Sequence, residues 1–131
     1  LDRRFLIEEE VGAVKAEIRD VLDRVKARRP GFDYTIRDLF EVQPTMTDRA
    51  APVVRTVAGA IREVLGAEAE YVVSPGTYDQ KHIDRIGRLH NCIAYGPGLL
   101  HLAHQPDEWV GVQDMLDAAQ VMGRSLEQLL L

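Results

Sequence analysis

The residues best suited to chemistry lie in the segment 95–108, where two histidines and two acidic side chains follow a glycine-rich turn. His104 is the leading candidate, because a neutral imidazole on a loop can bind Zn²⁺ through either ring nitrogen. Glu108 could orient that imidazole, as carboxylates near metal-bound histidines do. Spacing alone favours the plainer alternative of a surface histidine beside polar neighbours, since a zinc site needs three or four protein ligands.

The other histidines do not complete such a site. His101 lies three residues before His104, but His-x-x-His in a loop is a weak metal-binding signal. His82 and His90 have no metal-ligand spacing. The chain also contains no Cys-x-x-Cys, no His-Glu-x-x-His and no phosphate-binding glycine-rich loop. The sequence therefore offers one candidate ligand rather than a complete metal centre.

Two further positions could bind an anion. Residues 76–79 form a turn between a predicted strand and a predicted helix, where backbone N–H groups and the Thr77 hydroxyl could hold a negative charge. Alternatively, Thr77 or Asp79 simply caps that helix. Arg49 stands at the start of another predicted helix and could bind a substrate carboxylate through two hydrogen bonds. A solvated arginine is the plainer interpretation, and the sequence by itself favours it.

The candidate loop begins where a short apolar run ends. Residues 92–95 are predicted to form a buried strand, which Gly96 and Gly98 end because glycine adopts backbone angles that other residues avoid. Pro97 between them removes a backbone donor. Open α/β sheets bind ligands in loops at the carboxyl ends of strands, ahead of a helix. This position makes the loop a candidate site rather than a mere connection.

Composition limits the possible functions. The chain has 131 residues, 46% of them hydrophobic and 28% charged, which suits one domain or two small lobes. A net charge of −5 argues against a nucleic-acid or anionic membrane partner, and no apolar run approaches the roughly 20 residues of a membrane helix. The single cysteine, Cys92, excludes an internal disulfide framework and favours a reducing compartment, here the cytoplasm. The missing initiator methionine suggests a piece of a longer protein.

The first part of the chain reads as strand, helix, strand. Residues 1–7 and 32–42 alternate apolar and polar side chains, which predicts strands that are wet on one face. Between them, an apolar stripe predicts a helix that starts near Glu8 and ends at residues 30–31 (Pro-Gly). This order indicates a small sheet covered by helices on one face. The polar segment 43–47 is the predicted boundary between lobes.

From residue 48 onward the predicted order is α-β-α-β-α, with helices over 48–65 and 80–86 and short strands at 71–73 and 92–95. The closing helix carries an apolar stripe formed by Val112, Met115, Leu116, Ala119, Met122, Leu126, Leu129 and Leu130. Two short strands are too few for a free-standing parallel sheet, whose strands need both faces covered. We therefore expect further strands to come from elsewhere.

Four sets of residues, in this order, resemble the C-terminal half of a metal-dependent amidohydrolase. They are residues 2–5 with Glu9, residues 75–79, residues 95–98 and residues 103–108. The family is the one that contains acetylornithine deacetylase, succinyl-diaminopimelate desuccinylase, aminoacylase and carboxypeptidase G2. The resemblance spans nearly the whole chain, and its most specific part is the string Gly-Pro-Gly followed by Ala-His-x-Pro-x-Glu.

The resemblance implies a mixed α/β fold in which a catalytic α/β domain carries an inserted lid. The lid of this family is a two-layer α+β domain that mediates homodimerisation. By the same resemblance, residues 1–47 are the C-terminal part of the lid, and residues 48–131 are the C-terminal part of the catalytic domain.

The resemblance also implies a chemistry. Family members hydrolyse an amide with two zinc ions, which cobalt can replace, and a glutamate that activates the bridging water; metal-bound water is nucleophilic near neutral pH. His104 matches the last metal ligand. Substrate-binding positions are matched by Gly98 and by the turn of Gly76 and Thr77, which Asp79 supports. Arg49 matches, with a small gap in register, the arginine that holds the substrate carboxylate.

The family's remaining metal ligands and its general base precede the lid, so the resemblance places no catalytic residue in this chain. We therefore expect a fragment of a hydrolase acting on N-acyl amino acids or small peptides, inactive alone, with exposed sheet edges that favour association and a homodimeric parent. One alternative is a non-catalytic dimerisation or binding module derived from the same fold. Another is an unrelated α/β domain whose Gly-Pro-Gly loop holds a small anion.

Overall fold

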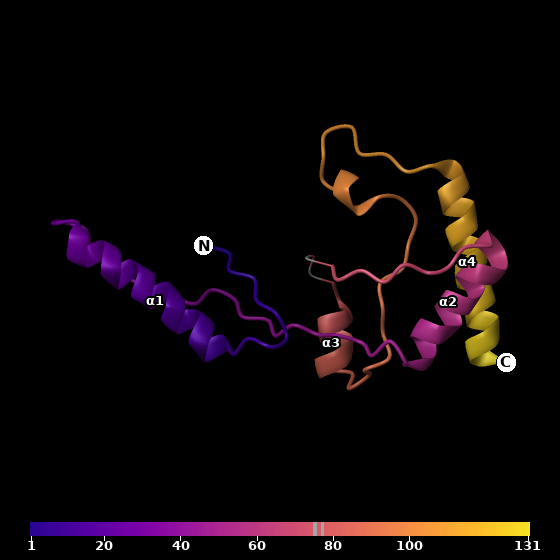
Figure 1. Cartoon of the computed structure of the whole chain (residues 1–131), viewed down its shortest axis with the longest axis horizontal. Coiled ribbons are helices and arrows are strands. Elements are labelled where there is room, and N and C mark those ends of the chain that lie inside the picture. Colours follow the sequence, from indigo (N-terminus) through magenta and orange to yellow (C-terminus); the bar gives the residue numbers. More distant parts are fainter. Residues whose placement is uncertain (75, 77) are drawn as a thin grey trace. The chain divides into compact units, whose positions relative to one another are not determined.

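The structure is a computed structural model that describes residues 1–74, 76 and 78–131 (Figure 1). Its helices are α1 (Val11–Arg28), α2 (Pro52–Leu65), α3 (Gln80–Arg85), the 3₁₀ helix η1 (Leu100–Leu102) and α4 (Val112–Leu130). The chain divides into two compact units, Leu1–Met46 and Thr47–Leu131. The assignment of residues 1–47 to a lid and of residues 48–131 to a catalytic domain stays a prediction.

The four predicted α-helices are confirmed, and their ends follow local chemistry. Helix α1 carries Lys26 and Arg28 in its last turn, where the helix dipole favours positive charge. Helix α2 begins at Pro52, which suits the first helical position. It ends at Gly66, whose left-handed backbone (φ +65°) costs glycine little. Helix η1, a single short turn inside the candidate loop, was not predicted.

The predicted strands at 1–7, 32–42, 71–73 and 92–95 are absent from the described residues, so the α/β layering is not observed. Alternating apolar and polar side chains are not enough for a strand, because a strand also needs a neighbour that completes its ladder of hydrogen bonds. Outside the helices, the backbone–backbone hydrogen bonds of the described residues join positions no more than six apart. The alternation that predicted these strands says nothing about whether a partner strand is present.

In the first unit, charged side chains join the segment 32–42 to α1. The Lys15 ammonium lies 2.8 Å from the Asp38 carboxylate and 2.6 Å from that of Glu41. Lys26 pairs with Asp33 at 2.6 Å. Because these groups are exposed to water, the pairs position the segment without providing a core.

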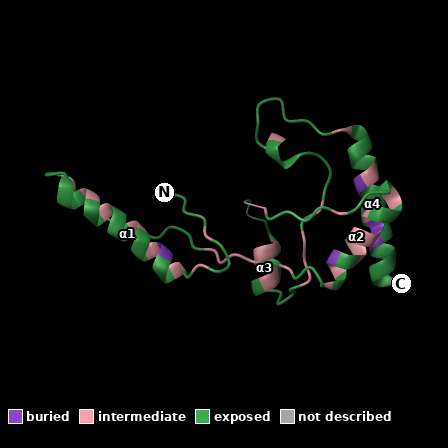
Figure 2. Ribbon diagram, in the orientation of Figure 1, coloured by how far each residue is buried: buried purple, intermediate pink, exposed green. Residues whose placement is uncertain are grey.

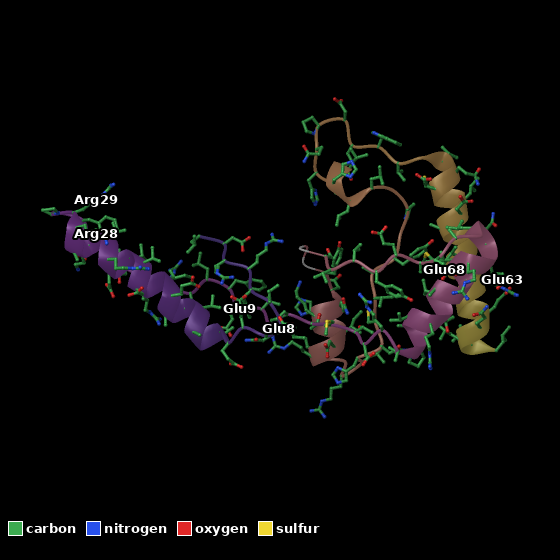
Figure 3. All side chains as sticks on the ribbon, in the orientation of Figure 1. Glu8, Glu9, Arg28, Arg29, Glu63 and Glu68 are labelled. Atoms are coloured by element: carbon green, nitrogen blue, oxygen red, sulfur yellow. The ribbon has the colours of Figure 1, made fainter. Side chains whose placement is uncertain are left out.

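The second unit is built on the contact between α2 and α4. Its buried apolar side chains are Val54, Ala60, Ala118 and Val121, which lie along the two helices (Figure 2). At the edge of this contact the guanidinium of Arg124 on α4 lies 2.6 Å from the carboxylate of Glu63 on α2. Figure 3 labels Glu63 together with Glu68, which pairs with Arg62 at 2.7 Å.

A large part of the surface stays in water. The chain exposes 10576 Å², whereas a folded monomer of 14.7 kDa typically exposes about 6900 Å². Apolar side chains contribute to this surface in both units, among them Phe40 at 78% and Val73 at 88% exposure. Among the described residues, no helix combines the length and the apolar character needed to cross a membrane.

Candidate functional site

The candidate loop turns sharply on either side of His104. The backbone of His104 is left-handed (φ +63°), and so is that of Asp107 (φ +61°). This conformation costs an L-residue about 1–2 kcal/mol, although histidine and aspartate tolerate it better than most. The Glu108 carboxylate accepts a hydrogen bond from the backbone N–H of His104 at 3.0 Å. Both side chains are exposed, so the loop presents His104 to solvent.

Glu108 therefore makes a different contact from the one expected. The sequence suggested a carboxylate that orients the imidazole, but the observed acceptor contact is to the backbone of His104. The short spacing explains this, because four residues with two left-handed turns bring the carboxylate back to the peptide N–H. Glu108 acts on the main chain of the loop.

The donors of this chain do not fit a complete metal centre. Across residues 1–74, 76 and 78–131, no three His, Cys, Asp or Glu side chains gather closely enough to hold a metal ion. His101, which belongs to η1, does not supply a second ligand in such a group. His104 can therefore contribute one ligand, and a metal centre would need donors from outside the described chain.

Gly98 lies in an open pocket of about 260 Å³ in the second unit. The pocket is lined by Leu65, Tyr95, Gly96, Pro97, Gly98, Leu99, Asp114, Asp117 and Ala118. A Cβ at Gly98 would lie 3.2 Å from the Val110 side chain, and its backbone is left-handed (φ +86°), so a larger residue would strain this wall. Burial, with a smaller contribution from the Asp117 charge, raises the pKa of the Tyr95 phenol. His104, Arg49 and Gly76 do not line the pocket.

The remaining predicted site residues lie in other contacts. The guanidinium carbon of Arg49 lies 5.2 Å from the centre of the Tyr71 ring, a cation–π contact, and among the described residues no hydrogen bond links Arg49 to the His104 loop. The backbone N–H of Gly76 donates to the Ser74 hydroxyl at 3.1 Å. Thr77 lies outside the described residues. The structure does not bring Arg49, Gly76, Gly98 and His104 into one site.

The sequence did not reveal a polar anchor that fixes the segment leading into the loop. The Gln80 amide donates to the Cys92 carbonyl at 2.6 Å and to the Thr47 hydroxyl at 3.0 Å, and Thr47 also donates to the Cys92 carbonyl. The Asn91 side chain accepts the N–H of Val53, in the first turn of α2, at 2.9 Å. These contacts join positions 12 to 45 apart, which periodicity cannot predict.

Comparison with known proteins connects these features to one family. The sequence profile of peptidase family M20/M25/M40 matches residues 4–128. The chain is 32% identical to the succinyl-diaminopimelate desuccinylase of Nitrosomonas europaea over 98% of its own length and 32% of that protein. The corresponding enzyme of Pseudoalteromonas atlantica is 33% identical over 76% of the chain and 25% of that protein. The chain thus spans a third or less of these relatives, and no solved structure gives a significant match.

Proposed function

Because the chain belongs to peptidase family M20/M25/M40, we propose that it is part of a hydrolase that cleaves the amide bond of N-acyl amino acids or small peptides. The observation that carries the proposal is the family match over residues 4–128. The desuccinylases among its relatives favour an N-succinyl amino acid as the substrate. Membership of this family argues against an unrelated α/β domain that binds a small anion.

Members of this family are generally metal-dependent. We propose zinc, as two ions that cobalt could replace, with His104 as one ligand and the other ligands in segments beyond this chain. Two observations support this division: the exposed position of His104 on a constrained loop, and the lack of any three-donor group among the described residues. By itself the chain should be inactive.

We propose the α/β fold because the second unit leaves apolar surface uncovered. The predicted strand 71–73 exposes its apolar side chains, and Val72 and Val73 are the most exposed of them. One face of α4 also carries large apolar side chains in water, including Met115 and Leu126. A sheet completed by strands from the rest of the protein would pair such backbones and bury such a helix face.

The substrate-binding roles of Arg49, Gly76, Thr77 and Gly98 remain proposals. The Arg49 guanidinium lies 5.2 Å from the centre of the Tyr71 ring, and a guanidinium has five N–H donors that could hold a substrate carboxylate. The pocket beside Gly98 offers space for a small molecule. Because these residues do not converge in this chain, the proposed site must be completed by further segments.

The test is a chimera in which this chain replaces the matching third of the Nitrosomonas europaea desuccinylase. We expect metal-dependent release of succinate from succinyl-diaminopimelate. His104→Ala should lower this activity by more than the roughly 10–100-fold lost with outer partners of a metal site. His101→Ala, three residues away on the same segment, is the matched control and should retain activity. An active His104→Ala chimera would reject the proposed ligand.

A second candidate is a non-catalytic dimerisation module, favoured by the exposed apolar residues of the first unit, such as Leu39 and Phe40. An exposed, extended apolar segment readily pairs with another chain, and we propose this unit as the homodimer contact of the parent. Zinc titration of the isolated chain tests whether this chain holds a complete metal centre. Tight stoichiometric binding would contradict the claim that the other ligands lie elsewhere, whereas weak binding agrees with it.

A further inference from the structure

The direction in which the His104 side chain leaves the loop depends on its backbone. With φ at +63°, the Cβ atom projects from the opposite side of the chain compared with an extended or right-handed residue. Rotation about the side-chain bonds can then place the imidazole only where this backbone conformation allows. A left-handed backbone is disfavoured for a residue with a Cβ atom, so a specific contact must hold it.

The Glu108 carboxylate provides that contact. The neighbouring N–H groups of Ala103 and Gln105 donate to the carbonyls of Leu100 and Leu102, at 3.1 and 3.2 Å. The N–H of His104 donates instead to the Glu108 carboxylate at 3.0 Å. A hydrogen bond to an ionised carboxylate is stronger than one to a neutral carbonyl. Ala103 is extended (φ −61°, ψ 134°), and among the described residues the next N–H, that of His104, has no backbone acceptor, so the Glu108 side chain accepts it instead.

We propose that Glu108 is a positioning residue that holds the His104 backbone left-handed and so fixes the direction of the imidazole. The functional importance of that direction rests on the proposed function, which makes His104 a metal ligand. The contact itself is a property of this chain and can be tested without metal or substrate. Either carboxylate or amide oxygen can accept the N–H, so glutamine should replace glutamate and alanine should not.

The test is NMR spectroscopy of the full chain with Glu108→Ala and Glu108→Gln. In Glu108→Ala we expect the His104 amide to exchange with water about tenfold faster, which corresponds to about 1.4 kcal/mol. Its HN–Hα coupling and the NOEs of its imidazole should change together, because the backbone leaves the left-handed region. Glu108→Gln should restore all three signatures. Glu127→Ala, which removes an exposed glutamate from α4, is the matched control and should change none of them.

Unchanged His104 signals in Glu108→Ala, with far-UV circular dichroism showing intact helices, would overturn the proposal. So would a change that Glu108→Gln fails to rescue. These outcomes are distinct from failure of the proposed function. If the His104→Ala chimera stays active while Glu108→Ala still releases the loop, then His104 is not the ligand but Glu108 does position it.

Discussion

Two faces of α4 differ in how they are covered. The face against α2 is built from small or medium side chains, Ala118, Val121 and Ser125, and these are buried. The adjacent face of the helix carries larger apolar side chains, and Leu126 is 53% exposed there. The hydrophobic effect favours burial of the larger side chains first, because the gain grows with the apolar area removed from water.

The apolar stripe that the sequence shows on α4 is not the face that packs on α2. The stripe of large residues that includes Met115, Met122 and Leu126 is exposed, because α2 packs on the small residues instead. Small side chains let two helices approach closely, and the Arg124–Glu63 pair closes the edge of that contact. The large stripe thus points to a second partner layer, in agreement with the proposed sheet.

The sharpest test of the comparison places the same charge on each face of α4. Val121→Asp should lower the free energy of unfolding by about 3 kcal/mol, because the carboxylate would be buried without a partner. Leu126→Asp should stay within about 0.5 kcal/mol, since that position lies in water. Urea unfolding followed by circular dichroism measures both. Equal losses would show that the two faces are covered alike.

A smaller loss of stability is expected when a larger side chain is placed in the contact between α2 and α4. Ala60 is completely buried on α2, three residues before Glu63 and so on the side that contacts α4. Ala60→Leu should destabilise the second unit by about 1–3 kcal/mol, because the helices would have to separate. Ala119→Leu, at an exposed position of α4, is the control. A lowered melting temperature for the control alone would reverse our assignment of the faces.

The smallest effect concerns the edge of the contact. The hydrogen bond from Arg124 holds the pKa of the Glu63 carboxyl below its usual value of 4.5. A lowered folded-state pKa stabilises the fold above pH 4.5, and this contribution disappears as the pH falls through the lowered value. We expect Glu63→Gln to flatten the acid side of the stability–pH curve slightly, since the pair is exposed and salt screens it.

Urea unfolding at several pH values measures this difference. Glu70→Gln is the control, because among the described residues no ion pair engages Glu70. If the stability of wild type and of Glu63→Gln fell equally at acid pH, the Arg124–Glu63 pair would contribute nothing to folding.

Features that depend on neighbouring residues could be predicted from the sequence, whereas backbone angles and contacts between distant residues could not. The helices were predictable because their signals lie within the helix or next to it, as with Pro52 and Gly66 around α2. The His104 loop was found through its residue string, but its left-handed turns and the Glu108 contact were not, since they depend on backbone angles. The anchor between Thr47, Gln80 and Cys92 left no periodic signal at all.

The sequence by itself determined the order of the four α-helices and the family to which the chain belongs, because these depend on nearby residues and on a motif string read in order. The helix starts expected near Glu8 and at residue 48 were early, since α1 begins at Val11 and α2 at Pro52. Only the tertiary structure decided which face of α4 is buried and, among the described residues, which predicted strands lack a partner. The physical reason is that burial and strand pairing are properties of two surfaces in contact. An amphipathic stripe specifies that a surface needs a partner, and the folded chain shows which partner it has.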